Sequence, residues 1–478
     1  PNPGANNLPG ALVFVDDLGR KGFQNTYWKQ ISPKFGFAYE VNSKMVVRGG
    51  YGINNMPPNM NGFSFPGTLG YSGSIAVNSA NTQLRFAEEP VMFLHDRYPD
   101  FTDTLPNKRA DLSNGLGITY IAPDSNRLGY TQNWNLGFQF QLPASTVLEV
   151  NYVGNKGTRL EADGLGDLNA LPTTLLSRGN VLGEQWSPAT GIPEPFPGFR
   201  GSVVQALRPY PQFTGVGQIF NNFGTSTYNS LQVQATRHWR GGFSILGAYT
   251  WSKAIALTSS SIDSEGAADI FNRGLERSIT SYHIPHVAKL TWIYELPIGP
   301  GKALNVPGIA GKIIGGWQLT GNHQFRSGNP ISIGTGGISN PFGAARADYV
   351  AGQDITLSGD APINFRGVAG GQAYLNRAAF DNPPVHPGGR NVITRLGTLG
   401  ERLPNIRDRH LVMEDLGMSK IFQIDEFRSF EIRGVFLNPF NRVGKGGLVT
   451  AINNPFFGQF TGPQHGGRNI ELSARITF

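Results

Sequence analysis

The chain has 478 residues, of which 15% are charged and 39% hydrophobic, whereas glycine (63 residues) and proline (33 residues) are abundant. Soluble domains have about 25% charged and about 45–50% apolar residues, so this composition does not fit the roughly three ordinary domains that the length suggests. No apolar run reaches the ~18 residues of a transmembrane helix. The lack of cysteine excludes disulfides and thiolate sites, and the diffuse net charge of +7 makes a nucleic-acid partner implausible.

Alternation of apolar and polar side chains, which is typical of a strand with one apolar and one polar face, recurs along the whole chain. It is clearest from Trp134 to Leu142, where apolar residues occupy every even position. Tight turns join most of these segments into pairs. The predicted strand pairs are 32–41 with 45–53, 128–142 with 146–160, 226–240 with 243–256, 283–297 with 316–332, and 409–424 with 427–442, and a last strand covers 468–478.

Long links rich in Gly, Pro, Asn and Ser separate the pairs, at roughly 54–127, 161–225, 257–282, 333–408 and 443–467. Structureless links of this size are uncommon in compact soluble domains. Short turns at one end of the strands and long loops at the other are typical of an outer-membrane β-barrel. We therefore predict an all-β fold, an antiparallel transmembrane β-barrel with eleven strands in this chain, long extracellular loops and a C-terminus in the periplasm.

Aromatic residues stand near both ends of the predicted strands. Because Trp and Tyr rings favour the two membrane–water interfaces, these residues are predicted to form two belts. The alternative is that they are core aromatics of a soluble sandwich, but the apolar face would then need a partner sheet. The residues near the tight turns are Trp239, Trp292, Tyr294 and Trp317, and those toward the long loops are Tyr130, Trp134, Tyr249 and Trp251.

Several short segments, in their order along the chain, suggest a family. They are 32–39 (SPKFGFAY), 47–52 (VRGGYG), 228–232 (YNSLQ), 249–253 (YTWSK), 284–286 (IPH), 294–299 (YELPIG), 315–319 (GGWQL), 325–330 (FRSGNP) and 436–441 (FLNPFN). Together they resemble recurring segments of TonB-dependent outer-membrane receptors, specifically the Oar-like group, which carries a carboxypeptidase-regulatory-like domain ahead of its plug.

The resemblance implies a barrel of about 22 strands around a plug, placed in the cell outer membrane and importing a bulky nutrient. Residues 1–478 would be the C-terminal half of that barrel, since neither a plug, a TonB-contacting segment nor the N-terminal strands are recognisable. A start at Pro1 without Met or signal peptide indicates a fragment or a processed product. TonB is then expected to act only through a plug that this chain lacks.

The last strand fits a signal for barrel assembly. In the resembled proteins the chain ends in an aromatic residue, preceded by apolar residues at alternate positions, and the barrel-assembly machinery binds this strand. An edge strand offered for pairing is the physical basis, and an ordinary terminal strand of a soluble sheet is the alternative. The residues of the predicted signal are Ile470, Leu472, Ala474, Ile476 and Phe478.

Motifs for catalysis or cofactor binding are not found, so we expect no enzyme, no cofactor, no catalytic residue and no metal site. His283 and His286 would lie on opposite faces of a strand, and His323 on an apolar face. The acidic stretch 263–269 lacks EF-hand spacing and is expected to be a solvated loop.

Polar residues of the strands are expected to line the lumen of the barrel, and loop aromatics to pack within the loops or stack on a ligand. No ligand-binding residue is assigned. The expected lumen residues are Asn135, Gln139, Gln141, Gln232, Gln234, Gln318, Asn322, Gln324 and Arg326, and the loop aromatics are Trp28, Trp186, Phe196 and Phe220.

Two other functions stay open at this stage. A non-transporting surface protein would use the barrel to anchor long loops that bind a partner, a polymer or other cells. A secreted all-β carbohydrate-binding protein would be soluble without detergent. For a barrel, the expected partners are outer-membrane lipid, the phosphates of lipopolysaccharide met by basic loop residues, and the assembly machinery.

Overall fold

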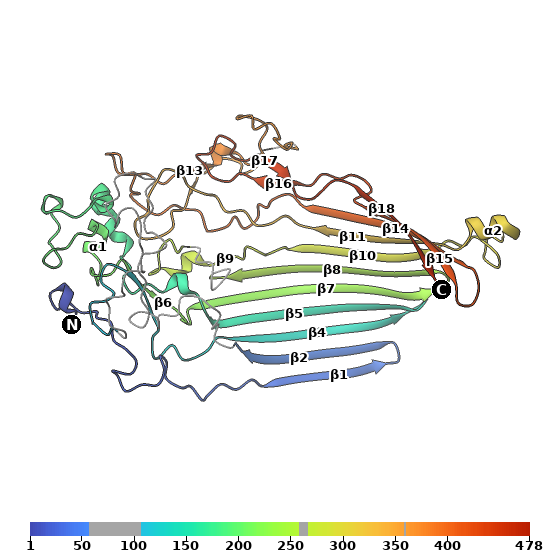
Figure 1. The fold of residues 1–478 in the computed structure, drawn as a ribbon, viewed down its shortest axis with the longest axis horizontal. Coiled ribbons are helices and arrows are strands. Elements are labelled where there is room, and N and C mark those ends of the chain that lie inside the picture. Colours follow the sequence, from blue (N-terminus) through green and yellow to red (C-terminus); the bar gives the residue numbers. More distant parts are fainter. Residues whose placement is uncertain (57–106, 258–265, 358–359) are drawn as a thin grey trace, which may run out of the picture.

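The computed structural model describes residues 1–56, 107–257, 266–357 and 360–478. Most of its regular structure is one antiparallel sheet, in which the long strands follow one another in chain order (Figure 1). The eleven long strands are β1 (Lys34–Asn42), β2 (Met45–Asn55), β4 (Tyr130–Leu142), β5 (Thr146–Leu160), β7 (Gly224–Arg240), β8 (Phe243–Ala256), β10 (His286–Glu295), β11 (Trp317–Arg326), β14 (Leu411–Gln423), β15 (Ser429–Leu437) and β18 (Asn469–Thr477). The predicted all-β antiparallel architecture is confirmed.

Tight turns lie at one end of this sheet, where only the link between β10 and β11 is long among the described residues, and the other long links lie at the opposite end (Figure 1). Gly241 and Gly242 join β7 to β8 with φ of 61° and 78°, the left-handed backbone that a two-residue hairpin turn requires. The turn between β14 and β15 is longer than the predicted Asp425-Glu426 pair. It covers residues 424–428, because Asp425 Oδ1 accepts hydrogen bonds from the backbone N–H groups of Phe427 and Arg428, at 3.0 and 2.8 Å.

The pairing register gives the sheet one apolar and one polar face. Residues directly opposite one another point to the same side, so a row of partners identifies each face. One row on the apolar face is Tyr39, Val47, Phe138, Val150, Val233, Tyr249, Ala288, Phe325 and Val412. The neighbouring row on the polar face is Gln139, Glu149, Gln234, Ala248, Lys289, Gln324 and Met413.

Both edges of the sheet are open. β1 pairs only with β2, β18 pairs only with β15, and every residue of the two edge strands is exposed. Within the described residues no strand covers either outer edge, so the sheet does not close and the predicted barrel of 22 strands is not established by this chain.

The buried core lies outside the sheet, in the links at its long-link end. We call these described segments the loop cap: residues 1–33, 107–129, 161–223, 266–285, 327–357, 360–410 and 438–468. The largest fully buried apolar side chains of the described residues all belong to it, namely Phe380, Phe460, Leu182, Leu375 and Ile393. The described parts of the long links are therefore folded and packed.

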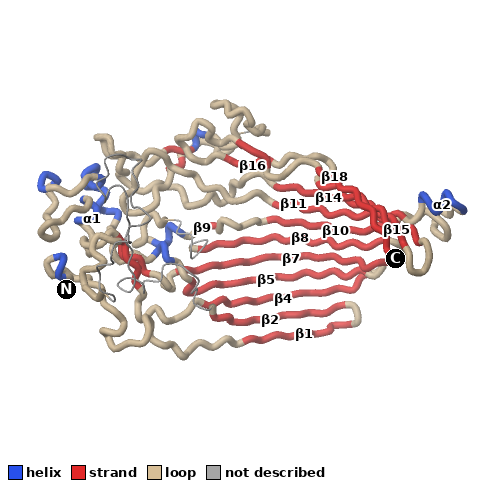
Figure 2. Tube along the Cα trace, viewed as in Figure 1, coloured by secondary structure: helices blue, strands red, loops and turns tan. Residues whose placement is uncertain are grey.

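Short strands and helices lie along the loop cap (Figure 2), and two main apolar clusters pack it. One cluster joins Leu176 and Val203 to Ile393, and the other joins Leu375 and Phe380 to Phe457. The elements are β3 (Gly117–Tyr120), β6 (Gly215–Gln218), β9 (Ser278–Ile279), β12 (Asp348–Tyr349), β13 (Phe380–Asp381), β16 (Lys445–Leu448), β17 (Phe460–Pro463), α1 (Val203–Ala206), and the 3₁₀ helices η1 (Pro3–Ala5), η3 (Asp163–Leu165), η4 (Thr173–Gly183), η5 (Pro188–Thr190), η6 (Arg273–Glu276) and η7 (Arg377–Ala379).

A second helix, α2 (Gly308–Ile314), lies at the opposite end of the sheet, in the link between β10 and β11 (Figure 1). In the part of the chain that the structure describes, neither helix is long and apolar enough to cross a bilayer.

Candidate ligand-binding pocket on the polar face

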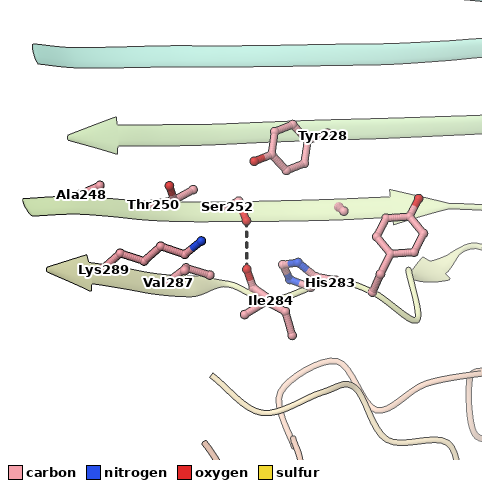
Figure 3. Close-up of a pocket in the computed structure, with 10 residues that line it drawn as sticks. Tyr228, Ala248, Thr250, Ser252, His283, Ile284, Val287 and Lys289 are labelled. Carbon is pink, nitrogen blue, oxygen red and sulfur yellow. Dashed lines mark hydrogen bonds between the residues drawn. The ribbon is translucent and has the colours of Figure 1, made fainter. Parts of the chain in front are cut away.

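A pocket of about 370 Å³ opens on the polar face of the sheet, where β7, β8 and β10 enter the loop cap (Figure 3). Tyr228, Thr250 and Ser252 reach it from the strands because all three occupy polar-face positions. The segment before β10 closes it from the cap side. The lining residues are Tyr228, Ala248, Thr250, Ser252, Ala254, Tyr282, His283, Ile284, Val287 and Lys289.

His283 is the most enclosed polar residue of this pocket. Only 4% of it is exposed, and its Nδ1 atom has no hydrogen-bond partner among the described residues. Its backbone is fixed, since its N–H donates to Thr280 O at 3.0 Å and its carbonyl accepts from Arg407 Nη1 at 2.8 Å. Burial, reinforced by the charges of Arg407 and Lys253, lowers the pKa of His283 to about 4. The ring is therefore neutral at pH 7, and its Nδ1 atom is buried beside the pocket.

Lys289 and hydroxyl groups complete the polar lining. Ser252 is held in place, because its Oγ donates to Ile284 O at 3.1 Å and its N–H donates to Pro285 O at 2.8 Å. Lys289 stands on the polar face of β10 and brings an ammonium group to the rim (Figure 3). Neutral imidazole, hydroxyls and one cation suit a hydrogen-bonding ligand that carries carbonyl, hydroxyl or anionic groups.

This pocket was not predicted from the sequence, although a signal for it existed. Three of the family-like segments, 228–232, 249–253 and 284–286, meet there, contributing Tyr228, Thr250, Ser252 and Ile284. The expected lumen residues share the same face: Asn135, Gln139 and Gln141 of β4, Gln232 and Gln234 of β7, and Gln318, Asn322, Gln324 and Arg326 of β11 all occupy polar-face positions.

Some of the aromatic residues assigned to belts lie near strand ends, but Tyr249 is the seventh of the fourteen residues of β8 and Trp292 the seventh of the ten residues of β10. Tyr294 pairs with Phe243 beside the turn of β7 and β8, and Tyr130 opens β4 at the cap end. Trp134, Tyr249, Trp251, Trp292 and Trp317 share the apolar face, and Trp239 stands one residue before the end of β7. Their role at a membrane interface stays a prediction.

The histidines singled out in the sequence do not assemble a common site. His286 points to the apolar side, where its Nδ1 lies 2.8 Å from Tyr249 Oη, while His283 lines the pocket on the polar side. His323 is on the apolar face as expected, and its Nε2 accepts a hydrogen bond from Trp292 Nε1 at 3.1 Å. The described residues include no group of three or more potential metal ligands.

The predicted loop residues have different surroundings. Trp186 packs edge-on against Phe199 and donates to Ile192 O at 2.9 Å, and Phe196 also contacts Phe199. Trp28 is exposed. In the acidic stretch, residues 263–265 lie outside the described residues, whereas Asp269 accepts hydrogen bonds from Thr173 Oγ1 and Phe271 N.

The residues of the predicted assembly signal share one face of the edge strand β18. Ile470, Leu472, Ala474 and Ile476 lie opposite Phe436, Gly434, Ile432 and Phe430 of β15. Phe478 follows β18 and is 95% exposed. An interaction with assembly machinery stays a prediction.

Comparisons with known proteins agree with this architecture. The family model described as the outer membrane beta barrel domain matches residues 2–471. A search of curated proteins gives no match.

Solved outer-membrane proteins show a distant likeness. The outer membrane transporter YddB from Escherichia coli is 11% identical, with a TM-score of 0.42 over 94% of this chain and 41% of that chain. The ferripyoverdine receptor of Pseudomonas aeruginosa is also 11% identical, with a TM-score of 0.37 over 94% of this chain and 33% of that chain. The FrpB iron transporter from Neisseria meningitidis is 9% identical, with a TM-score of 0.38 over 94% of this chain and 39% of that chain. The chain thus spans less than half the length of each of these proteins.

Proposed function

This chain belongs to the family of outer-membrane β-barrel domains and resides in the outer membrane, and we propose that it forms part of the wall of a TonB-dependent receptor that imports a bulky nutrient. The observation that carries the proposal is the hydrogen-bonding pocket on the polar face, directly beneath the loop cap. A ligand captured by the cap would meet this pocket on entering the lumen.

The open edges support a larger barrel. Residues 1–478 would be its C-terminal half, and further strands would pair with the exposed edges of β1 and β18. A plug outside this chain would occupy the lumen and contact TonB. In this arrangement the polar face, including the Gln234 and Gln324 row, hydrates the lumen and hydrogen-bonds the plug.

The apolar face would contact lipid. Its row from Tyr39 to Val412 crosses nine strands without a charged residue, as a lipid-facing band requires. The two aromatic groups then lie at the two interfaces, the tight turns face the periplasm, and the loop cap faces outward toward lipopolysaccharide. The exposed β18 edge would be the strand that the barrel-assembly machinery engages.

A comparison of spent media tests transport. The native host, a deletion strain and a strain lacking TonB are grown on a complex nutrient mixture, and the remaining compounds are measured by mass spectrometry. We expect some compounds to be removed from the medium only by the native host, which has both this protein and TonB. Identical depletion by all three strains would refute the import function.

The pocket is tested with variants of the complete protein. His283→Phe fills the pocket and removes its free nitrogen, and Lys289→Met removes its cation; both should reduce uptake of the depleted compound. Lys44→Met, in the exposed turn between β1 and β2, is the matched control. Unchanged uptake in both pocket variants would show that the ligand does not bind in this pocket.

A non-transporting surface role is the second candidate, and the packed core of the loop cap favours it. Clusters around Ile393 and Phe380 give the cap a fixed shape, which a binding surface for a polymer or another cell needs. Replacing the cap segments 333–408 and 443–467 by short turns while keeping the barrel separates the two roles. Lost adhesion with intact uptake would support the surface role.

A further inference from the structure

The link between β10 and β11 contains helix α2 and lies at the tight-turn end of the sheet (Figure 1). The described hairpins beside it turn within a few residues, whereas residues 296–316 extend well beyond the strand ends. This segment belongs neither to the loop cap nor to the candidate pocket, and its position calls for its own explanation.

Two side chains of the apolar face hold the C-terminal end of α2. Lys420 Nζ donates to Lys312 O at 2.5 Å, to Ile313 O at 2.7 Å and to Gly315 O. Trp317 Nε1 donates to Ile313 O at 3.2 Å. Carbonyls at a helix C-terminus have no partner within the helix, so these donors satisfy groups that would otherwise need water.

These attachments fix the side of the sheet on which α2 ends. Trp317 lies directly opposite Lys420, which lies opposite Ile432, and Trp317 is in line with Leu319 and Phe325 on the apolar face. Lys420 is 3% exposed, so its ammonium group is enclosed between the sheet and the helix end. The helix is therefore tied to the lipid-facing side of the strands and not to the lumen side.

The free surface of α2 is apolar. Ile309 and Ile313, four residues apart, are 78% and 56% exposed, and Ile314 beside them is 47% exposed. The opposite side of the helix packs on its own link, where a Cβ atom at Gly311 would lie only 1.7 Å from Val306 O. The isoleucines consequently point away from the protein, and leaving them in water is unfavourable.

We propose that α2 is an interfacial anchor that lies in the headgroup region of the periplasmic leaflet, with Ile309, Ile313 and Ile314 among phospholipid acyl chains. Because the apolar surface of α2 continues the apolar face of the sheet through Trp317, lipid is the partner that would cover it. Exposed Lys312 is placed to meet lipid phosphates, as snorkelling lysines do. The inference rests on the membrane orientation given above and not on any transported ligand.

Spin labels test this placement directly, because the chain has no cysteine of its own. Ile309→Cys and Ile313→Cys, each carrying a nitroxide, are compared with Lys302→Cys on the exposed part of the same link. The full-length protein is studied in vesicles of phosphatidylethanolamine and phosphatidylglycerol. We expect collisions with dissolved oxygen to rise, and collisions with a water-soluble nickel chelate to fall several-fold, at 309 and 313 relative to 302.

Two results would overturn the proposal. Nickel collisions at 309 and 313 equal to those at 302 would place α2 in water, and labels inaccessible to both probes would indicate a protein partner. A second variant tests the tether: Lys420→Met together with Ile313→Cys should increase label mobility and nickel access. Unchanged spectra in that variant would show that Lys420 does not hold the helix. Neither outcome depends on uptake activity.

Discussion

The buried ion pair of Glu276 and Arg346 is predicted to hold two segments of the loop cap together. Glu276 in η6 is 3% exposed and Arg346 is 9% exposed. Arg346 Nη2 bonds to Glu276 Oε2, while Glu276 Oε1 accepts the N–H of Ala268 at 2.8 Å. Arg346→Met would leave a buried carboxylate without its cation.

Removing one partner of a buried pair costs about 3–5 kcal/mol, because the remaining charge stays desolvated. At about 1.4 kcal/mol per factor of ten, local opening should become roughly 10²–10⁴-fold more frequent. The double variant Glu276→Gln with Arg346→Met removes both charges and retains an acceptor for Ala268 N–H. It should lose only about 1–3 kcal/mol, the cost of one amide left without a partner.

Hydrogen exchange followed by mass spectrometry measures this opening segment by segment. Arg346→Met should accelerate exchange in residues 266–279 and 342–350 and leave the β7–β8 hairpin unchanged. Arg200→Met, an exposed arginine of the same cap, is the control. The reasoning would be refuted if the double variant opened as often as the single one, or if both matched the native protein.

Three further predictions concern the core, the pocket and the C-terminus. Phe380→Ala, at a side chain only 1% exposed, should cost about 3–5 kcal/mol and open residues 374–381 to limited proteolysis without loss of the sheet. Because the pKa of His283 is lowered to about 4, the free energy of local unfolding around it should be highest above about pH 6.5 and should decrease as the pH falls toward 4. Hydrogen exchange of residues 280–285, corrected for intrinsic rates, measures this decrease. The variant His283→Gln should abolish it. Phe478→Ala should reduce the membrane-inserted fraction seen as a heat-modifiable band, and normal insertion would contradict an assembly role for this residue.

The strands were predictable because their signal is local. Each apolar–polar alternation and each short turn is contained in a few consecutive residues, as in Trp134–Leu142 and Gly241-Gly242. The turn after β14 is longer than the sequence predicts, because the carboxylate of Asp425 accepts the backbone hydrogen bonds that shape a five-residue turn. Turn propensity alone does not reveal these bonds.

The loop cap and the pocket were not predictable from local patterns. Phe380 packs on Phe457, which is far along the chain in another link, and no periodicity marks either residue. Likewise, Tyr228, Ser252 and His283 meet only because β7 and β8 pair in one register and the segment before β10 folds over them. Long-range packing of this kind has no signature in a single sequence.

The identity of strand order and chain order has an evolutionary consequence. Every pair of long strands joined at the tight-turn end is a self-contained hairpin. A hairpin such as β4 with β5, or β7 with β8, joins the sheet beside the preceding hairpin without crossing other strands. Duplication or loss of one such hairpin changes the number of strands in the sheet by two and keeps the antiparallel alternation of the strands. The segments of the loop cap are then free to diverge in length between descendants, while the registers that bind neighbouring hairpins constrain the strands.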